Sequence, residues 1–332
     1  MKQQPLVSTI IPTYNRASLV LQAIESVHQQ TYTNVEVIVV DDGSTDDTLA
    51  ALRCYGESIR VIRQENAGPA VARNRGIQAS RGEIIACLDS DDAWDSTKLE
   101  RQVRLLQLAG DSVPCCLCNA AMEFPDGRVV TTFDHSELSA ALDQGVWVNV
   151  ADVLSTRFVL MAQTLAVRRA AIQRIGGFDE TLQVLEDYDF GLRLALEGPW
   201  CYIREPLVRW RQNTRDSLSA KARVDALHLL CAVRLRHRMW KRVTDDDRHA
   251  RLRRLCSREL RRSKRVLRAS ELRRSGVATT SLAGEVLWHL EKYRGALYRR
   301  SPWYPRMLVT DVKRNVRQPW REYDAVEAGS AN

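Results

Sequence analysis

Short apolar runs alternate with helical segments through the first hundred residues, and this alternation limits the fold more than any other feature. The run VEVIVV at 35–40 is apolar almost throughout, which is typical of a parallel strand covered on both faces. Repeated strand–helix units predict an α/β fold with a doubly wound sheet. The predicted strands lie at 7–11, 35–40, 59–63 and 82–90, and the predicted helices at 17–30 and 69–79. Asn15 is expected to cap the first helix, and Ser44 and Asp47 stand at capping-box spacing.

The pattern changes after residue 115. CCLCNAAMEF, the PDG turn at 125–127 and RVVTTF predict an antiparallel hairpin, and FVLMAQTLAV at 158–167 predicts a further strand. Antiparallel elements beside parallel ones predict a mixed sheet. After about residue 215 the pattern is helical and basic. Helices are expected at 169–174, 186–197, 221–242 and 247–274.

The charge divides the chain into two unlike parts. The 332 residues hold 49 Lys and Arg against 41 Asp and Glu, for a net charge of +8. Residues 1–214 carry a net charge of −8, and residues 215–332 carry +16. The basic C-terminal region therefore favours an anionic partner.

The sequence favours a cytoplasmic protein. No run approaches the ~18 apolar residues that a membrane-spanning helix needs. The N-terminal segment, with Pro12 inside a short apolar run, lacks the pattern of a secretory signal. The eight cysteines show no spacing typical of a disulfide framework or a zinc site, which is expected in a reducing compartment.

Acidic clusters follow two of the predicted strands, at the sheet edge where α/β proteins bind ligands. Asp89, Asp91 and Asp92 place three carboxylates within four residues, and their mutual repulsion favours a bound divalent cation. Carboxylates together with phosphate oxygens are the usual ligands of Mg²⁺ or Mn²⁺. Taken alone, the same residues also suit a solvated loop with helix-capping aspartates.

Two further acidic pairs have alternative interpretations. Asp41 and Asp42 end the strand at 35–40, where they cap a turn or accept the imide N–H of uracil or thymine. Glu186 and Asp187 stand at a predicted helix start, where carboxylates compensate the helix dipole. The same pair suits a general base, because neighbouring negative charge and partial burial raise a carboxyl pKa.

Five segments, in this order, resemble the family 2 glycosyltransferases: VSTIIPTYNR, VEVIVVDDGSTDDT, NAGPAVARNRGI, IIACLDSDDAW and GGFDETLQVLEDYDFGLRLALEG. The resemblance covers residues 7 to about 214. It implies a GT-A fold with a nucleotide-binding half over about 1–110 and an acceptor half over about 111–215. The basic helical region that the residue pattern predicts over 216–332 lies outside the resemblance. The resemblance also implies an inverting enzyme that uses a nucleotide diphosphate sugar.

The resemblance also implies roles for individual residues. UDP is the favoured nucleotide, and Mg²⁺ or Mn²⁺ is the expected cofactor, since the cation would neutralise the diphosphate leaving group. Arg73 has a competing interpretation as a surface salt-bridge partner. The implied assignments are a metal ligand, Asp91; nucleotide-binding residues, Pro12, Tyr14, Asp42, Arg73, Asn74 and Asp89; catalytic residues, Asp187 as the base with Glu186 beside it; and sugar or acceptor contacts, Trp94, Gly177 and Asp179.

The chain departs from the family pattern in two places. Many relatives carry a His downstream of the acidic pair as a further metal ligand, whereas 205–219 holds none. Either Asn213 substitutes for it, or diphosphate and water complete the ligand shell. Arg209-Trp210 resembles the end of the QxxRW motif of processive synthases, but Pro206 stands in place of its Gln. The resemblance therefore implies a non-processive enzyme.

The basic region outside the resemblance has three interpretations. Its arginine pairs, with Trp and Tyr nearby, suit the anionic inner face of the plasma membrane, which would deliver a lipid-linked glycan acceptor for cell-surface polysaccharide assembly. Nucleic acid is a weaker candidate partner. The third is a solvated helical subdomain that packs on the catalytic part or on a second copy of the chain.

Two other functions stay open at this point. A sugar-phosphate nucleotidyltransferase would need a Gly-rich, basic phosphate loop after the first strand, where this chain has PTYNRAS. The second open function is that of a non-enzymatic protein, which binds a nucleotide sugar or a nucleic acid through the basic region.

Overall fold

The computed structural model describes residues 4–157, 159–212, 233, 235–239, 241–243, 250–274 and 309–310. These residues belong to two compact units. The first unit holds residues 4–150 and 159–212 with the short strand at 309–310, and the second holds 151–157 and the described residues between 233 and 274.

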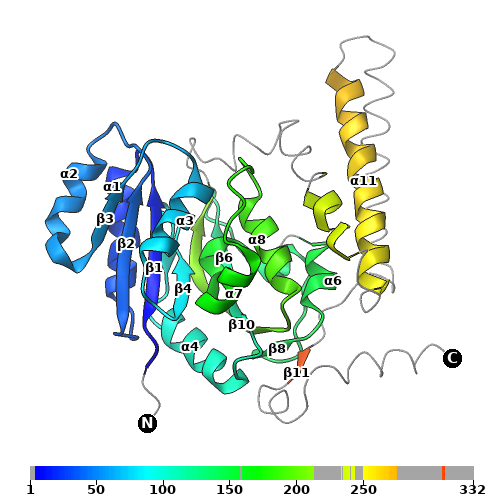
Figure 1. The fold of residues 1–332 in the computed structure, drawn as a ribbon, viewed down its shortest axis with the longest axis horizontal. Helices are drawn as coiled ribbons and strands as arrows, with labels where there is room; N and C mark the ends of the chain where they lie inside the picture. The colour runs from blue at the N-terminus through cyan, green and yellow to red at the C-terminus, as the bar shows by residue number, and fades with distance from the viewer. Residues whose placement is uncertain are drawn as a thin grey trace. The chain divides into compact units, whose positions relative to one another are not determined.

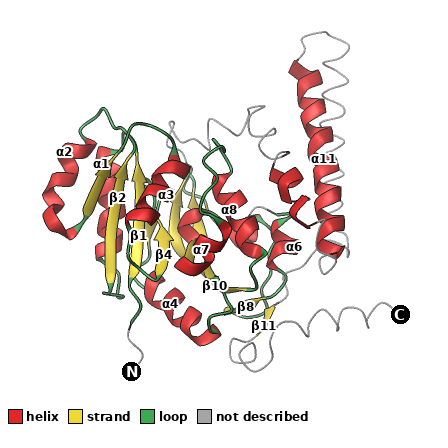
Figure 2. Cartoon of the chain, in the orientation of Figure 1, coloured by secondary structure: helices red, strands yellow, loops and turns green. Residues whose placement is uncertain are grey.

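An 11-stranded sheet forms the centre of the first unit (Figure 2). Its strand order is β11-β8-β10-β6-β9-β4-β1-β2-β3, with β5 beside β10 and β7 beside β6. The strands are β1 Val7–Thr13, β2 Val35–Asp41, β3 Arg60–Arg63, β4 Ile84–Cys87, β5 Ala93–Trp94, β6 Cys115–Glu123, β7 Val129–Thr131, β8 Gln144–Trp147, β9 Leu165–Arg168, β10 Trp200–Arg211 and β11 Val309–Thr310.

Helices follow most of the strands. The α-helices are α1 Ala17–His28, α2 Thr48–Leu52, α3 Pro69–Ala79, α4 Lys98–Ala109, α5 Thr132–His135, α6 Val150–Leu154, α7 Arg169–Ile175, α8 Glu186–Ala195 and α11 Ala250–Arg274, and the 3₁₀ helices are η1 Arg53–Ser58 and η2 Ala162–Thr164.

Strands β3, β2, β1 and β4 lie side by side and run parallel, which confirms the predicted strand–helix repeat. Helix α3 packs on β1 and β2 (Figure 1). The helix can approach the strands closely because Gly76 has no side chain. A Cβ at Gly76 would lie only 2.3 Å from Ile10 Cγ2 and 3.2 Å from Val40 Cγ2. The carboxyl ends of β1, β2 and β4 are thereby held at one edge of the sheet.

Strand β1 continues through Pro12, which was expected to end it. The carbonyl of Ile10 accepts the N–H of Leu88, just after β4 ends. Backbone groups two residues apart in a strand face the same side, so the N–H that Pro12 lacks would point to where β4 has already ended. Proline is tolerated at such a position because no ladder bond is lost.

The other half of the sheet is mixed, as predicted. Strand β9 runs antiparallel to both β4 and β6, β10 runs parallel to β6, and β6 with β7 forms the predicted hairpin. The strand expected over 158–167 is wrong in its first part, because a 3₁₀ turn precedes β9. In that turn Thr164 Oγ1 donates to the carbonyl of Met161 at 2.7 Å, which competes with strand pairing. Strands β5, β8, β10 and β11 and helices α4, α5 and α6 were not predicted.

The two predicted helix caps are wrong. Asn15 adopts a positive φ of 51°, and its Oδ1 accepts the N–H of Thr45 at 2.8 Å rather than capping α1. Ser44 Oγ accepts the N–H of Asn15 at 2.9 Å, and Asp46 instead accepts the N–H of Thr48 at the start of α2. The residue types suited caps, but the structure uses them to tie the loop after β1 to the loop after β2.

The second unit contains the long helix α11, which confirms the helix predicted over 247–274. Described residues at 235–239 and 241–243 are also helical. One face of α11 is buried, through Leu252, Leu255, Cys256 and Leu260. The helical region expected over 216–332 also supplies strand β11, which pairs with β8. No helix among the described residues has the length and apolar character needed to cross a membrane.

Candidate active site

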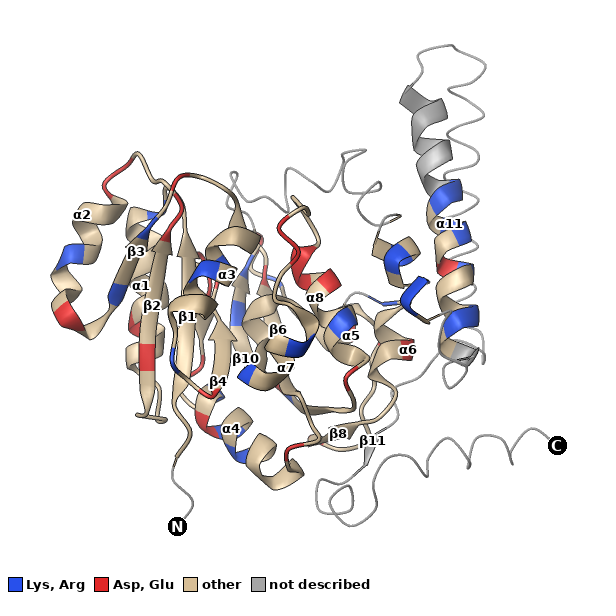
Figure 3. Cartoon of the chain, viewed as in Figure 1, with Lys and Arg blue, Asp and Glu red and all other residues tan. Residues whose placement is uncertain are grey.

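Three acidic segments are candidates for a binding site at the carboxyl edge of the sheet. Asp41 ends β2 and Asp42 follows it, the turn 89–92 follows β4, and Glu186-Asp187 opens α8. Figure 3 shows acidic residues in the loop after β2 and at the start of α8. Because β2 and β4 are parallel, their carboxyl ends lie at the same edge.

Arg73 joins two of these segments. Its Nη1 donates to Glu186 Oε1 and its Nη2 to Asp89 Oδ1, both at 2.7 Å. The Arg73 side chain is only 5% exposed, and its guanidinium lies 5.3 Å from the centre of the Phe178 ring. A buried guanidinium that is paired twice and stacked on a ring is held in one orientation. Arg73 is therefore a buried bridge, not a surface salt-bridge partner.

Asp187 has the titration expected of a base at neutral pH. Burial and the charge of Glu186 raise the pKa of the Asp187 carboxyl to about 7, although the nearby Arg73 acts in the opposite direction. Asp187 Oδ1 accepts the N–H of Tyr188 at 2.7 Å, which leaves the other oxygen available. The preceding Leu185 has a positive φ of 64°, a strained backbone conformation for a branched residue. This turn begins α8 at the acidic pair.

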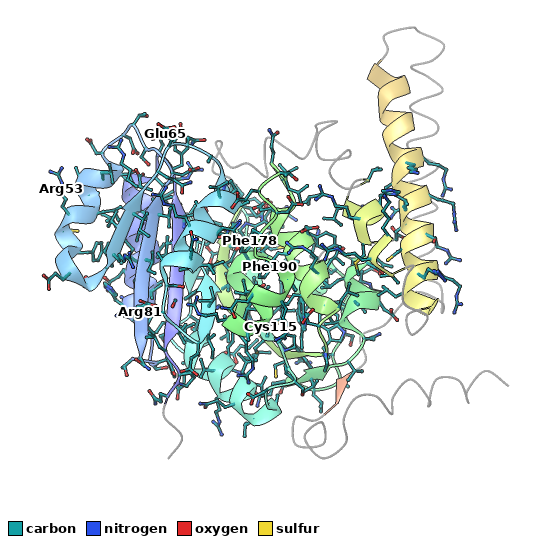
Figure 4. All side chains as sticks on the ribbon, in the orientation of Figure 1. Arg53, Glu65, Arg81, Cys115, Phe178 and Phe190 are labelled. Carbon is teal, nitrogen blue, oxygen red and sulfur yellow. The ribbon has the colours of Figure 1, made fainter. Side chains whose placement is uncertain are left out.

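The ring of Phe178 lies between Arg73 and helix α8 and contacts both. It stacks on Phe190 of α8, with ring centres 4.2 Å apart and planes 10° apart. Figure 4 labels both rings, which lie next to each other. The two rings thus fix α8 against the loop before it, and with α8 the position of Glu186 and Asp187.

The acidic turn relieves its repulsion without needing a metal for every carboxylate. Asp89 is paired with Arg73, and Asp91 lies 3.9 Å from Arg16 Nη2. Asp92 is 2% exposed, and burial with the charges of Asp91 and Asp89 raises the pKa of its carboxyl well above the ordinary value. The acidic turn therefore needs a cation less than its sequence indicates, because Arg16 and Arg73 already pair with two of its carboxylates.

The fit of these residues to a divalent cation can be judged from their exposure. Asp91 and Asp89 are the carboxylates of the turn that keep access to solvent, and 23% of the Asp91 side chain is exposed. Among the described residues no three His, Cys, Asp or Glu side chains form a ready metal cluster. This donor set suits Mg²⁺ or Mn²⁺ held mainly by phosphate oxygens and water with one protein carboxylate. Asn213, the candidate further ligand, lies outside the described residues.

Asp42 is already engaged with the chain. Its Oδ1 accepts from Gln64 Nε2 at 2.7 Å and from the N–H of Ala67 at 2.9 Å, and its Oδ2 accepts the N–H of Gly68 at 2.9 Å. It therefore fixes the loop that leads into α3. Asp41 accepts the N–H of Ser44, in agreement with its turn-capping interpretation. Pro12 is buried in β1, and Tyr14 beside it is 46% exposed.

Asn74 fastens the loop before α8. Its Oδ1 accepts the N–H of Phe178 at 2.8 Å, and its Nδ2 donates to the Phe178 carbonyl at 2.9 Å. Gly177 has a φ of +74°, and a Cβ there would lie 2.7 Å from Asn74 Oδ1, so only glycine fits without displacement. Asp179 Oδ1 accepts from Thr181, closing the next turn. In this structure Asn74, Gly177 and Asp179 order the loop.

Trp94 lies in the core and not on an open face. Its side chain is 2% exposed, and its Nε1 donates to the carbonyl of Gln163 at 3.2 Å. Lys98 Nζ lies 3.9 Å from the centre of its ring. In this conformation the ring packs beneath the acidic turn and presents no surface to a sugar.

Three residues of the site were missed from the sequence. Gln163 Nε2 donates to Asp92 Oδ2 at 2.7 Å, the N–H of Arg211 donates to Asp92 Oδ1 at 3.0 Å, and Arg16 faces Asp91. Gln163 and Arg211 lie more than seventy residues along the chain from the turn that they contact. The only feature of the sequence that could have indicated Gln163 and Arg211 is their position. Each lies beside or at the end of a strand that neighbours the acidic turn.

Comparisons with known proteins show the family of the chain. The model of "Glycosyl transferase family 2" matches residues 8–151, and that of "Glycosyl transferase family group 2" matches residues 84–266. An uncharacterized glycosyltransferase of Rickettsia prowazekii is 32% identical over 66% of this chain and 70% of its own length. The succinoglycan biosynthesis protein ExoO of Rhizobium meliloti is 32% identical over 69% of this chain and 67% of its own length.

Solved structures share the fold. TarS 1-349 of S. aureus in complex with UDP-GlcNAc gives a TM-score of 0.61 at 18% identity, covering 90% of this chain and 82% of that one. The mannosyltransferase PcManGT of Pyrobaculum calidifontis, in complex with GDP-Man and Mn²⁺, gives 0.51 at 19% identity over 90% and 87%. The mixed sheet is thus that of the GT-A glycosyltransferases. The chain belongs to family 2 of these enzymes and is a glycosyltransferase.

Proposed function

We propose that this glycosyltransferase moves a sugar, with inversion at its anomeric carbon, from a UDP-sugar to a hydroxyl of a glycan or lipid-linked glycan. The observation that carries the proposal is the Arg73 bridge, which holds Glu186 and the acidic turn together beside a carboxyl, Asp187, whose pKa lies about 7. Polysaccharide assembly is the proposed pathway, since ExoO, a succinoglycan biosynthesis protein, is similar over two thirds of its length.

Asp187 would act as the base of a single displacement. The acceptor oxygen attacks the anomeric carbon, the bond from that carbon to the diphosphate breaks, and the acceptor proton passes to the free oxygen of Asp187. A carboxyl with a pKa near the working pH is half ionised there and still basic enough to take the proton. Glu186, fixed by Arg73, keeps Asp187 in place and raises its pKa.

The other predicted residues would bind the donor. Asp91 is the proposed ligand of Mg²⁺ or Mn²⁺, and the cation when bound would neutralise the leaving diphosphate. Asp89 would meet the ribose, and Pro12 with the exposed Tyr14 would form the wall beside the base. Asp42 and Arg73 would act mainly by holding the loop into α3 and the acidic turn, because their polar atoms are already bonded to the chain.

Donor binding should depend on the cation through Asp91. We expect a UDP-sugar with Mn²⁺ to raise the melting temperature of the wild type, and Asp91→Asn to remove most of the gain that Mn²⁺ adds. GDP-Man is the matched donor control. A thermal-shift screen of UDP-GlcNAc, UDP-glucose, UDP-galactose and GDP-Man, with and without Mn²⁺, measures this. An equal shift for GDP-Man, or an Asp91→Asn variant that responds as the wild type does, would contradict the nucleotide or metal assignment.

The exposed face of α11 is a candidate membrane surface. Over residues 252–265, where side chains are described, the exposed residues of this helix are all cationic, and the single acid, Glu259, is buried against Arg262. We propose that this face binds the anionic inner leaflet of the plasma membrane and brings the enzyme to a lipid-linked acceptor. The exposed set is Arg254, Arg258, Arg261, Lys264 and Arg265.

Charge removal on α11 should weaken lipid binding strongly. Each Lys or Arg near an anionic surface contributes about 1 kcal/mol, so changing Arg254, Arg258 and Arg261 to Gln together should lower affinity for phosphatidylglycerol vesicles on the order of 10²-fold. The matched control changes Arg53, Arg60 and Arg104, exposed arginines of the first unit, in the same way. Vesicle flotation at low and high salt measures binding. Equal flotation of both triple variants, or no flotation of the wild type, would remove this proposal.

A further inference from the structure

A groove on the α1 side of the sheet borders the acidic turn of the proposed donor site. It is open to solvent, has a volume of about 430 Å³, and lies entirely within the first unit. That volume is within the range of small-molecule sites. None of the residues assigned to the nucleotide, the metal or the base lines it. The lining residues are Leu21, Gln22, Glu25, Ser26 and Gln29 of α1, Tyr55 of η1, Ala93 of β5, and Arg209 and Arg211 of β10.

Two arginines are the positively charged residues that line the groove. Arg209 and Arg211 stand two residues apart on β10, so both side chains leave the same face of the strand. The exposed Arg209 side chain makes no hydrogen bond or ion pair with any residue that the structure describes. The two guanidinium groups together offer ten N–H donors in fixed forks, which suit carboxylate and phosphate oxygens.

The remaining walls suit a sugar. Gln22 and Gln29 are exposed polar side chains, whereas the Tyr55 ring and Leu21 supply apolar surface. Tyr55 Oη donates to the carbonyl of Leu21 at 3.1 Å, which fixes the ring as part of the wall. An aromatic ring beside amide groups suits a pyranose, whose faces are apolar and whose rim carries hydroxyls.

The charge in the groove is net positive. Glu25 is its single carboxylate, and Glu25 Oε1 already accepts from Gln29 Nε2 at 2.9 Å. The arginines therefore remain in excess by one charge. Ala93 stands directly opposite Arg209 in the β5–β10 pair, and both residues line the groove.

The groove is joined to the acidic turn by the backbone. Ala93 directly follows Asp92, and the N–H of Arg211 donates to Asp92 Oδ1 at 3.0 Å. A ligand held by the arginines would therefore bind beside, but outside, the place where Asp91 and Asp89 handle the donor.

We infer that this groove is a binding site for an anionic glycan segment, a sugar that carries a carboxylate or a phosphate. As a site for the acceptor chain, away from its reacting hydroxyl, it rests on the proposed transferase function; as a site that binds anionic sugars, it does not. The arginines would bind the anionic group, and Tyr55 with the glutamines would contact the sugar ring.

The test compares anionic with neutral sugars on the full chain. Trigalacturonate and glucose 1-phosphate are the carboxylate and phosphate probes, and maltotriose is the neutral probe, all titrated by calorimetry with saturating UDP and Mn²⁺ so that the donor site is filled. We expect one or both anionic probes to bind and maltotriose not to bind. The double variant R209Q/R211Q should weaken that binding at least tenfold, and the matched control Arg204→Gln, an exposed arginine of the same strand outside the groove, should leave it within twofold.

A second variant guards against a folding defect in the double variant. Gln22→Glu adds a negative charge to the groove from α1 without touching β10, and it should also weaken binding of the anionic probe. Binding of maltotriose as tight as that of the anionic probes, binding unchanged in both variants, or no binding of either anionic probe would overturn the inference. UDP release from the donor by the wild type is measured in parallel. Its absence would contradict the transferase proposal, and the binding result would still decide the groove.

Discussion

Replacing Asp187 by Asn is expected to lower sugar transfer by roughly 10²- to 10⁴-fold, the range that a general base contributes, while UDP-sugar binding is retained. The amide keeps the shape of the side chain and can still accept the N–H of Tyr188, but it cannot take the acceptor proton. The loss should therefore be in kcat, measured as transfer or donor hydrolysis at saturating donor.

The folding control for this variant follows from the raised pKa. In the folded protein the Asp187 carboxyl has a pKa of about 7, above the ordinary value of 3.8, so its protonated form is favoured and its contribution to stability is lost as the pH rises through 7. Asp187→Asn should thus be no less stable than the wild type at pH 8. Glu186→Gln, which keeps a hydrogen-bond acceptor for Arg73, should retain more activity. Transfer by Asp187→Asn at the wild-type rate would contradict the assignment of the base.

The pH dependence has a defined sign. Asp187 must be ionised to accept a proton, so kcat should fall about tenfold per pH unit below the pKa and level off above about 7. In Arg73 variants the midpoint should move to higher pH, because Arg73 lowers the pKa of Asp187.

Arg73→Met is expected to disturb both stability and catalysis. Removing the guanidinium leaves Asp89 and Glu186 without their 2.7 Å partner, and breaking a buried ion pair typically costs about 3–5 kcal/mol. The pH midpoint for transfer should rise above 7, and the donor KM should increase because Asp89 is no longer fixed. Urea unfolding and pH–rate profiles measure the two effects.

Arg193→Met is the matched control for Arg73→Met. Arg193 also makes a buried ion pair, with Asp189 of α8 at 2.7 Å, and its guanidinium lies 6.0 Å from the centre of the Phe190 ring. Its hydrogen bonds and ion pair with the described residues involve neither Glu186, Asp187 nor the acidic turn. It should lose stability comparably while keeping the wild-type pH midpoint. If both variants shifted the midpoint equally, or neither did, the bridge would have no specific effect on Asp187.

The sequence predicted the parallel half of the fold because each of its elements is specified locally. VEVIVV forms β2, and the segment that begins with Pro69 forms α3 with the predicted bounds. The mixed half was predicted less well. Strand β10 contains Glu205-Pro206 and two register irregularities, so its pattern is not strand-like, and β11 is a two-residue strand that only its pairing with β8 defines.

The site was predicted as a set of positions rather than as a set of contacts. Glu186 and Asp187 were found from their place before a helix, and Arg73 from a resemblance, but the bridge between them spans more than a hundred residues. No local pattern shows that Asn74 bonds the loop at Phe178 or that Trp94 is enclosed. Such contacts depend on which strands become neighbours. The strand order of the sheet determines this, and the local sequence does not show it.

The configuration of the released sugar tests the proposed reaction most directly. Proton NMR can follow an α-linked UDP-sugar, chosen from the thermal-shift screen, during hydrolysis or transfer by the wild type with Mn²⁺. A single displacement with Asp187 as base predicts that the β-anomer forms first and that the α-anomer grows only by later mutarotation. Initial release of the α-anomer, or a donor that binds and is never cleaved, would contradict an inverting transferase.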